Sequence, residues 1–207
     1  MAKPCAFEGQ SLLDHMKGVE EIVKRKFISD GYDLVVNKRM GRSDGKDLVL
    51  LSSILHDIGK ADERYQNQFD DECKAKVGKF SFKDHEVISS AYALKAGLDP
   101  HVAMAVLLHH HAMRVPDEKV INSMGGAKLY MTEELCKYLK SHGVECIDSL
   151  SRDEIRAVMY LPKKVKPQFV SLLELPLVVS DNLDSQRRGD DDDRRVFISE
   201  LKKLYGG

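Results

Sequence analysis

Histidine and aspartate side chains are the part of this sequence that could do chemistry. The chain contains eight histidines and no tryptophan. A group of these histidines and aspartates falls on the inner faces or at the ends of five different predicted helices. The group consists of His15, His56, Asp57, His85, the consecutive His109, His110 and His111, and Asp181. Burying a titratable side chain costs free energy unless it is paired or bound to a metal ion, so several that converge on one core need a common partner.

A metal cluster would be that partner. Imidazole nitrogen and carboxylate oxygen, without thiolate, suit ions such as Mn, Fe, Co, Ni or Zn. His56 and Asp57 are adjacent within an apolar stretch. Because a helix turns by about 100° per residue, their side chains can reach two sides of one cluster. His101 and His142 stand at a helix end or turn without a carboxylate-rich context, and we interpret them as ordinary histidines.

Apolar residues that recur every three or four positions predict helices over most of the chain. The expected helices cover residues 11–28, 47–58, 84–96, 99–111, 132–140 and 168–188, and one more follows residue 151. Ser11, Asp47 and Asp84 are the expected caps of the first three helices, and Asp99 precedes a proline at the start of the fourth. Ser151 begins a capping box with the glutamate three residues later. These elements would position the histidines and aspartates.

Two segments between these helices have a different character. Residues 30–46 hold three glycines and are expected to form an irregular connection, with a short extended piece at 34–36. Residues 62–80 are polar and charge-dense, which is typical of a flexible or ligand-facing excursion. Pro176 is expected to bend the long helix in which it lies.

Length and composition indicate one globular domain. The chain has 207 residues, 43% of them hydrophobic and 31% charged, which excludes a disordered tail and a membrane protein. We expect a single all-α domain over residues 1–207, with its core at about 10–188 and a C-terminal helical extension at about 194–205. The net charge of −1 gives no overall field to attract nucleic acid. No secretory signal is visible and the four cysteines are far apart, so we expect a cytoplasmic protein with reduced cysteines.

The order of the candidate ligands resembles the H…HD…D pattern of the HD superfamily of metal-dependent phosphohydrolases. His15, His56, Asp57 and Asp181 match that pattern, and the string LHDIGK at residues 55–60 is its most specific part. The resemblance implies an HD-domain helical bundle with a metal site in its core, one ion being held by those four residues. His85, His109 and His110 would complete a second site with Asp57 bridging the two ions, and His111 is the alternate ligand.

Further motifs narrow the resemblance to the HD nuclease domain of type I CRISPR interference systems. They are HDIGKA at 56–61, the following Tyr65 and Gln66, His85 with Glu86 and Ser89, the histidine run, and SDNL at 180–183 with Ser185. The family implies a divalent-metal-dependent DNA nuclease that hydrolyses phosphodiester bonds of single-stranded DNA and R-loop strands with a metal-activated hydroxide. The implied cofactors are two divalent transition-metal ions (Mn, Ni, Co, Fe or Zn), with Mg as a further possibility. The implied partners are a separate CRISPR helicase subunit and the RNA-guided surveillance complex, and no membrane.

Several residues near the ligands have expected roles of their own. Asp57 and Lys60 are the expected catalytic residues. Asp57 would bridge the two ions, and Lys60 could neutralise phosphate charge in the transition state. Ser185 is expected to orient groups around the ligands. The expected DNA-binding residues are Arg64, Tyr65, Arg114, Arg187 and Arg188, which lie within a few positions of proposed ligands. Residues 41–47 resemble a P-loop only superficially, so no helicase is expected within this chain.

Two other functions remain open. The first is an HD phosphohydrolase that acts on nucleotides or cyclic nucleotides. The Gly-Tyr-Pro motif of the cyclic-dinucleotide branch does not follow the histidine run, and only Gly31-Tyr32-Asp33 occurs, upstream. The second, from another class, is a non-catalytic subunit of an effector complex in which the metal only staples the bundle.

Overall fold

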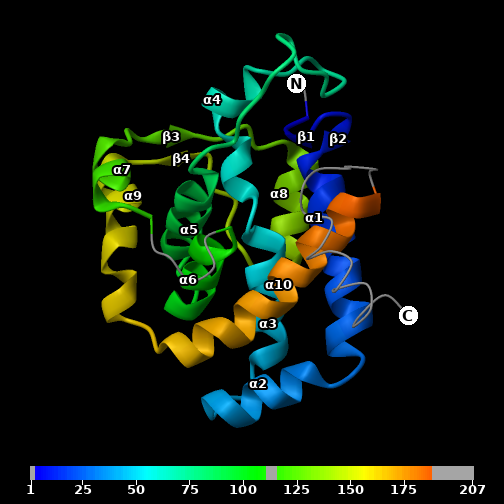
Figure 1. Ribbon diagram of the computed structural model, residues 1–207, viewed down its shortest axis with the longest axis vertical. Helices are drawn as coiled ribbons and strands as arrows, with labels where there is room; N and C mark the ends of the chain where they lie inside the picture. Colours follow the sequence, from blue (N-terminus) through cyan, green and yellow to red (C-terminus); the bar gives the residue numbers. More distant parts are fainter. Residues whose placement is uncertain (1–2, 111–115, 188–207) are drawn as a thin grey trace.

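Helices dominate the computed structural model, which describes residues 3–110 and 116–187 (Figure 1). The helices are α1 (Leu12–Val23), η1 (Lys24–Ile28), α2 (Tyr32–Met40), α3 (Gly45–Leu55), η2 (Ile58–Ala61), α4 (Glu63–Gln66), α5 (His85–Lys95), α6 (Pro100–Leu108), α7 (Glu118–Ser123), α8 (Glu133–Ser141), α9 (Arg152–Arg156), η3 (Ala157–Lys163) and α10 (Pro167–Arg187). Two short antiparallel strand pairs accompany them: β1 (Cys5–Phe7) with β2 (Gln10–Ser11), and β3 (Ala127–Lys128) with β4 (Ser149–Leu150). The predicted all-α class is confirmed, with these small strand pairs added.

The long helix α10 connects the helices that matter for the site. It packs against α1, α3 and α6, while α5 packs against α6 and η2. In Figure 1, α10 runs diagonally upward from the lower left, above α2, towards α1. The inner faces of these helices share one apolar core, which includes Met16, Ile54, Ile88, Val106 and Leu173. Each such buried side chain contributes about 1.5–3 kcal/mol, so the packing that stabilises the bundle also determines the spacing of side chains within it.

Most helix starts follow local sequence signals. The Ser11 side chain accepts a hydrogen bond from the backbone at the start of α1. Asp99 does the same for α6, with Pro100 at the first helical position. Ser151 and Glu154 form the predicted capping box of α9. These caps satisfy backbone N–H groups that have no partner within the helix, which is why the local sequence predicts them well.

The helix before His56 begins and ends earlier than predicted. α3 starts at Gly45, with Asp44 in the cap position and Asp47 in the first turn. It ends at Leu55, so Gly59 lies within η2 rather than at the end of the helix. A Cβ at Gly59 would lie 2.8 Å from the backbone nitrogen of Ser89 in α5. The missing side chain therefore permits the close contact between η2 and α5.

Residues 30–46 are not an irregular connection, because they contain α2. The predicted extended piece at 34–36 is therefore wrong. Gly31 (φ +76°) and Gly41 (φ +68°) adopt the left-handed conformation at the two ends of the helix, so these glycines mark its boundaries rather than a loop. Val36 is the buried residue of α2. One buried position in nine residues leaves no apolar stripe for periodicity to detect.

The expectation of reduced cysteines is also wrong. Cys5 is bonded to Cys73, with their Cα atoms 5.6 Å apart, and Cys136 to Cys146, with Cα atoms 5.1 Å apart. Partners separated by 68 and 10 positions form no recognisable spacing motif. The fold alone brings them together.

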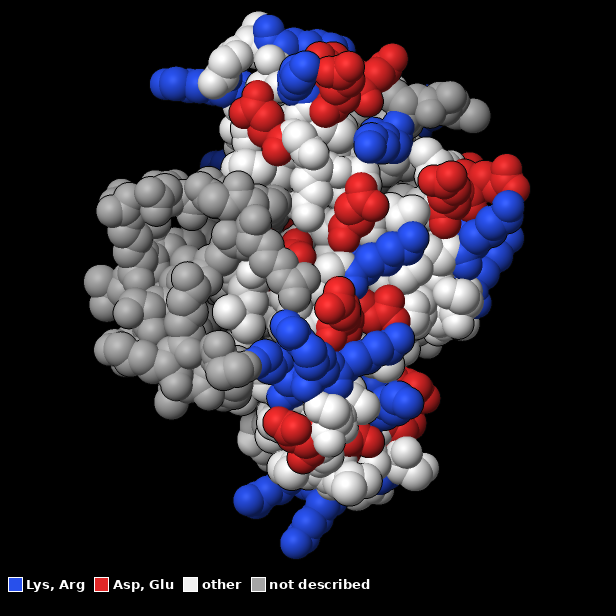
Figure 2. All heavy atoms as spheres, turned by 90° about the vertical axis from the view of Figure 1, so that its right-hand side faces the viewer, with Lys and Arg blue, Asp and Glu red and all other residues white. Residues whose placement is uncertain are grey.

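The surface of the molecule carries both acidic and basic side chains. The face shown in Figure 2 mixes acidic and basic side chains, in keeping with the net charge of −1.

Residues 62–80 contain α4 and a loop in which Phe69 and Cys73 are buried. The predicted extension at 194–205 lies outside the described residues. None of the described helices combines the length and the apolarity that a membrane crossing requires.

Candidate metal centre

Five helices each bring a candidate ligand to the same region of the core. His15 lies on the apolar stripe of α1, His56 and Asp57 directly follow α3, and His85 is the first residue of α5. His109 follows the last residue of α6, and Asp181 lies on α10. All six are buried. The structure therefore brings these histidines and aspartates together, although they are spread over much of the chain.

One group of four ligands contains His15, His56, Asp57 and Asp181, and one atom of each lies within 4.8 Å of the others. His15 Nε2 is 3.2 Å from His56 Nε2, 3.0 Å from Asp57 Oδ2 and 3.4 Å from Asp181 Oδ1. His56 Nε2 is 3.4 Å from the same Asp57 oxygen. Ligand atoms held 2.0–2.2 Å from one ion lie about 2.8–3.6 Å apart at octahedral or tetrahedral angles. The spacing of this group suits a single cation.

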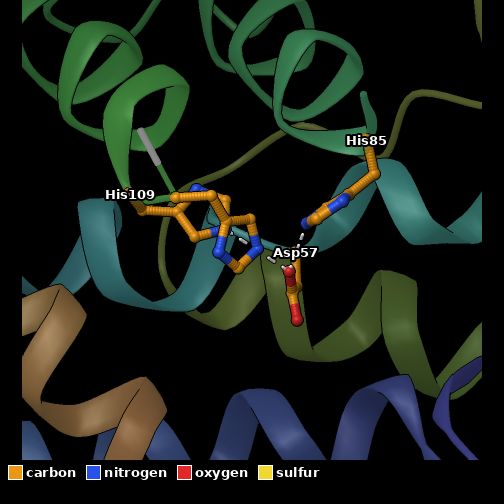
Figure 3. Close-up of side chains that lie close together, drawn as sticks. Asp57, His85 and His109 are labelled. Carbon is orange, nitrogen blue, oxygen red and sulfur yellow. Dashed lines mark hydrogen bonds and ion pairs between the residues drawn. The ribbon is translucent and has the colours of Figure 1, made fainter. Parts of the chain in front are cut away.

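A second group contains Asp57, His85, His109 and His110. Figure 3 shows His85 and His109 directed towards Asp57 from two different helices. His85 Nε2 lies 2.8 Å from Asp57 Oδ1, and His109 Nε2 lies 3.8 Å from the same oxygen. His109 is buried and His110 is exposed, so this group reaches the surface at His110. His111, the alternate ligand, lies outside the described residues.

Asp57 belongs to both groups and divides its two oxygens between them. Oδ2 faces His15 and His56, whereas Oδ1 faces His85 and His109. A carboxylate placed in this way can bridge two ions of a dinuclear site. The predicted bridging role of Asp57 requires such an arrangement of its two oxygens.

The outer nitrogens of the four buried histidines are all engaged, which directs the inner nitrogens at the site. His56 Nδ1 lies 2.6 Å from the Ser53 carbonyl oxygen, His85 Nδ1 2.7 Å from that of Phe82, and His109 Nδ1 2.6 Å from that of Val106. A carbonyl oxygen can only accept, so each Nδ1 carries the proton and each Nε2 can act as a ligand.

The state of His109 Nε2 supports a fit between these residues and a cation. This nitrogen is buried and, within the described residues, has no hydrogen-bond partner. A buried polar atom left without a partner costs free energy. Burial lowers the pKa of His109, so its ring is neutral at pH 7 and retains a lone pair for a metal ion.

The two carboxylates carry the negative charge that would attract such ions. Burial favours a raised pKa for Asp57, but His56 and Lys60 hold that pKa well below its ordinary value. Burial opposes ionisation of Asp181 too, yet hydrogen bonding and charge from His56 keep its pKa low. For His56, burial acts to lower the pKa, and Asp57 and Asp181 raise it to about 10. A divalent cation would compensate the same carboxylates in place of that proton.

Lys60 lies at the edge of the metal centre. Its Nζ is 2.6 Å from Asp57 Oδ2, and its side chain is 14% exposed. The same ammonium lies 5.0 Å from the centre of the Phe82 ring. Lys60 thus places a positive charge beside the shared carboxylate while keeping contact with solvent.

The predicted DNA-binding residues lie in different surroundings. Arg64 is paired with Asp62, its Nε lying 2.8 Å from Oδ1. Tyr65 is only 8% exposed, and its hydroxyl donates to the Lys83 carbonyl oxygen. A ring enclosed in this way cannot stack on a base, so Tyr65 has a packing role instead of the predicted one. Arg114, Arg188 and the side chain of Arg187 lie outside the described part of the chain, and Ser185 is half-buried on α10.

Asp184, which lies one turn after Asp181, is a site residue that was not predicted from the sequence. Asp184 is 4% exposed, and its Oδ2 lies 2.8 Å from His15 Nδ1. A carboxylate on the outer nitrogen fixes the orientation and tautomer of a ligating histidine. Gly18 makes room for it, because a Cβ there would lie 2.9 Å from Asp184 Cγ. The available signal was the spacing of three residues from Asp181, which places both acids on one side of the helix.

Comparison with known proteins identifies the family of this chain and a relative. Residues 12–153 match the HD domain. In an alignment 242 positions long, the chain is 29% identical to the CRISPR-associated endonuclease Cas3-HD of Saccharolobus solfataricus. That alignment covers 100% of this chain and 99% of the relative, so it extends through α10 and includes the part beyond the HD match.

Proposed function

The chain belongs to the HD domain family, and from that premise we propose that it is a divalent-metal-dependent nuclease that hydrolyses phosphodiester bonds of DNA in CRISPR interference. Its proposed substrates are single-stranded DNA and the displaced strands of R-loops. The relative named as a CRISPR-associated endonuclease supports this proposal, since the two chains match over their whole lengths.

The observation that carries the proposal is the position of Asp57 between two ligand groups. One oxygen faces His15 and His56 and the other faces His85, with all of these residues buried. A metal that only stapled the bundle would need one closed ligand set. Two sets that share a carboxylate, the second reaching the surface at His110, favour phosphodiester chemistry.

The chain's own residues would prepare the site for that reaction. Two divalent ions, when bound, would clamp phosphate oxygens and lower the pKa of water enough to supply hydroxide as the nucleophile at neutral pH. His56 and His85 are already oriented by backbone carbonyls and need no rearrangement to act as ligands. Lys60 can donate a hydrogen bond to a phosphate oxygen and offset charge that develops there. Mn, Ni, Co, Fe and Zn suit the nitrogen and oxygen donors, and Mg remains possible.

We also propose that unwinding of DNA belongs to a separate helicase subunit that acts with an RNA-guided surveillance complex. In a P-loop enzyme the phosphate-binding loop connects a strand to a helix. Here residues 41–44 connect the helices α2 and α3. This part of the chain therefore offers no such nucleotide-binding arrangement.

The experiment is a cleavage assay on single-stranded, duplex and R-loop DNA with added Mn²⁺. We expect the wild-type protein to cut the single strands and Asp57→Ala to abolish cutting with unchanged helical content by circular dichroism. Asp47→Ala removes an exposed carboxylate of α3 and is the matched control that should cut normally. Turnover of nucleotides with intact DNA would instead identify a nucleotide phosphohydrolase. Inactivity on both, with metal-dependent binding to an effector complex, would identify an assembly subunit.

A further inference from the structure

Residues 76–83, which we call the basic loop, combine lysines with aromatic rings in the sequence KVGKFSFK. Lys76, Lys79 and Lys83 are exposed, Phe80 and Phe82 are half-buried, and the segment contains no acidic residue. The loop lies between α4 and α5, in the part of the chain that forms the top of Figure 1. In Figure 2, blue side chains stand in this uppermost region beside red ones.

The basic loop leads directly into the metal centre. The carbonyl oxygen of Phe82 accepts a hydrogen bond from His85 Nδ1 at 2.7 Å. The other nitrogen of His85 lies 2.8 Å from Asp57. The Phe82 ring also lies under the Lys60 ammonium. A ligand lying along the loop would therefore reach Lys60 and the exposed side of the metal centre.

The loop is held in a defined shape. Gln68 binds both backbone groups of Ser81: its Nε2 donates to the carbonyl oxygen at 2.9 Å, and its Oε1 accepts from the amide at 2.9 Å. The Tyr65 hydroxyl donates to the Lys83 carbonyl oxygen at 2.6 Å. Phe80 and Phe82 rest on Phe69, with ring centres 5.0 and 5.6 Å apart from it. Little conformational freedom remains to be lost when a ligand binds.

The Cys5–Cys73 disulfide anchors the start of this region. Both cysteines are buried, and they pack with Phe69 against Phe80 and Phe82. The acidic residues that precede the loop are partly engaged: Lys74 pairs with Glu72, and Asp70 accepts two backbone hydrogen bonds. Within residues 76–83, lysines are the only charged residues.

We propose that the basic loop binds the substrate strand, with its lysines on successive phosphates and the Phe80 ring against a base. This inference rests on the proposed nuclease function. Non-specific binding of single strands depends on positive charges that follow the backbone and on aromatic rings that stack on bases. A duplex keeps its bases paired and offers no free faces to the ring, so the loop selects single strands.

The test measures binding of a fluorescein-labelled dT20 strand by fluorescence anisotropy in EDTA, where no cleavage interferes. Replacing Lys76, Lys79 and Lys83 together by Gln should weaken binding at least tenfold. It should also reduce the slope of log K against log salt concentration by about 2, because each phosphate contact on a single strand contributes about 0.7. The control replaces by Gln another exposed triplet, which consists of Lys163 at the end of η3 and Lys164 and Lys166 in the turn before α10. That control should bind dT20 like the wild type.

Phe80→Leu tests the aromatic part separately. Leucine keeps an apolar side chain against Phe69 but removes the ring face, so dT20 should bind at least fivefold more weakly, the lower end of what one stacked base contributes. Unchanged dT20 binding by the lysine variant, or an equal loss in the control triplet, would overturn the proposal. Hydrolysis of bis(4-nitrophenyl) phosphate by the wild-type protein with Mn²⁺ tests the metal centre without any strand. Its failure would count against the nuclease function, not against strand binding by the loop.

Discussion

Asp184 Oδ2 lies 2.8 Å from Nδ1 of His15, on the nitrogen opposite to the one that faces His56 and Asp57. Asp184 lies on α10 and His15 on α1, and 169 positions of sequence separate the two residues. The carboxylate thereby holds the ring so that Nε2 faces the other candidate ligands. The packing of α1 on α10 is therefore part of the metal centre and not only of the scaffold.

We predict that Asp184→Ala weakens Mn²⁺ binding by about 10- to 100-fold, as measured by isothermal titration calorimetry. The reason is that His15 would lose the partner that fixes its tautomer and orientation. Asp184→Asn should have a smaller effect, because the amide oxygen can still accept the Nδ1 proton. Equal, wild-type affinities for both variants would show that Asp184 does not position His15.

Gly59 should tolerate no side chain. An alanine Cβ at this position would overlap the His85 carbonyl oxygen and lie 2.8 Å from the Ser89 nitrogen, and both are backbone atoms that cannot move aside independently. We expect Gly59→Ala to lower the free energy of unfolding by about 1–3 kcal/mol in urea titrations and to weaken Mn²⁺ binding, because α5 carries His85. Gly125→Ala is the control, since nothing lies within 4 Å of a Cβ there. A stability equal to that of the control would refute the overlap.

Glu20 provides a pH-dependent test of the packing of α8 against α1. Burial acts to raise its pKa, but hydrogen bonds from Lys24 and Tyr138 and the charge of His142 hold the pKa below its ordinary value. A carboxyl group with a lowered folded pKa contributes stability above its unfolded pKa of about 4.3 and loses that contribution as the pH falls through the folded pKa.

The variant Glu20→Gln should therefore unfold about 1–2 kcal/mol more easily than the wild type at pH 7, a range typical of hydrogen bonds to charged groups. The difference between the two proteins should shrink below pH 4. Urea unfolding at pH 7, 5, 4 and 3 measures it. A difference that stays constant over this range would show that the charge of Glu20 is not what stabilises the contact.

The two disulfides should contribute unequally to stability. Cys5 and Cys73 close a loop of 68 residues, and Cys136 and Cys146 one of 10 residues. Constraint of the unfolded chain corresponds to about 4 kcal/mol for the first loop and about 3 kcal/mol for the second. Replacing both cysteines of one pair by alanine and measuring urea unfolding without reductant compares them. The reverse order of the two losses would contradict this explanation.

Features that depend on neighbouring residues could be predicted from the sequence, and features that depend on distant residues could not. The N-caps at Ser11, Asp99 and Ser151 lie where predicted, because a cap depends on a side chain and a backbone group a few residues away. α2 was missed because its helical state depends on packing of Val36 and on glycines that end the helix, not on an apolar stripe. Tyr65 was misjudged because nothing in its neighbours along the chain indicates burial against Phe82.

The helical class could be predicted without the structure, and so could the histidines and aspartates that lie on apolar faces, because both follow from the periodicity of neighbouring residues. Three relationships became visible in the folded chain alone: one oxygen of Asp57 faces His15 and the other faces His85, Asp184 supports His15, and Cys5 is bonded to Cys73. These relationships depend on how whole helices and loops pack against one another. Distances between side chains on different elements follow from that packing, which no short stretch of sequence encodes.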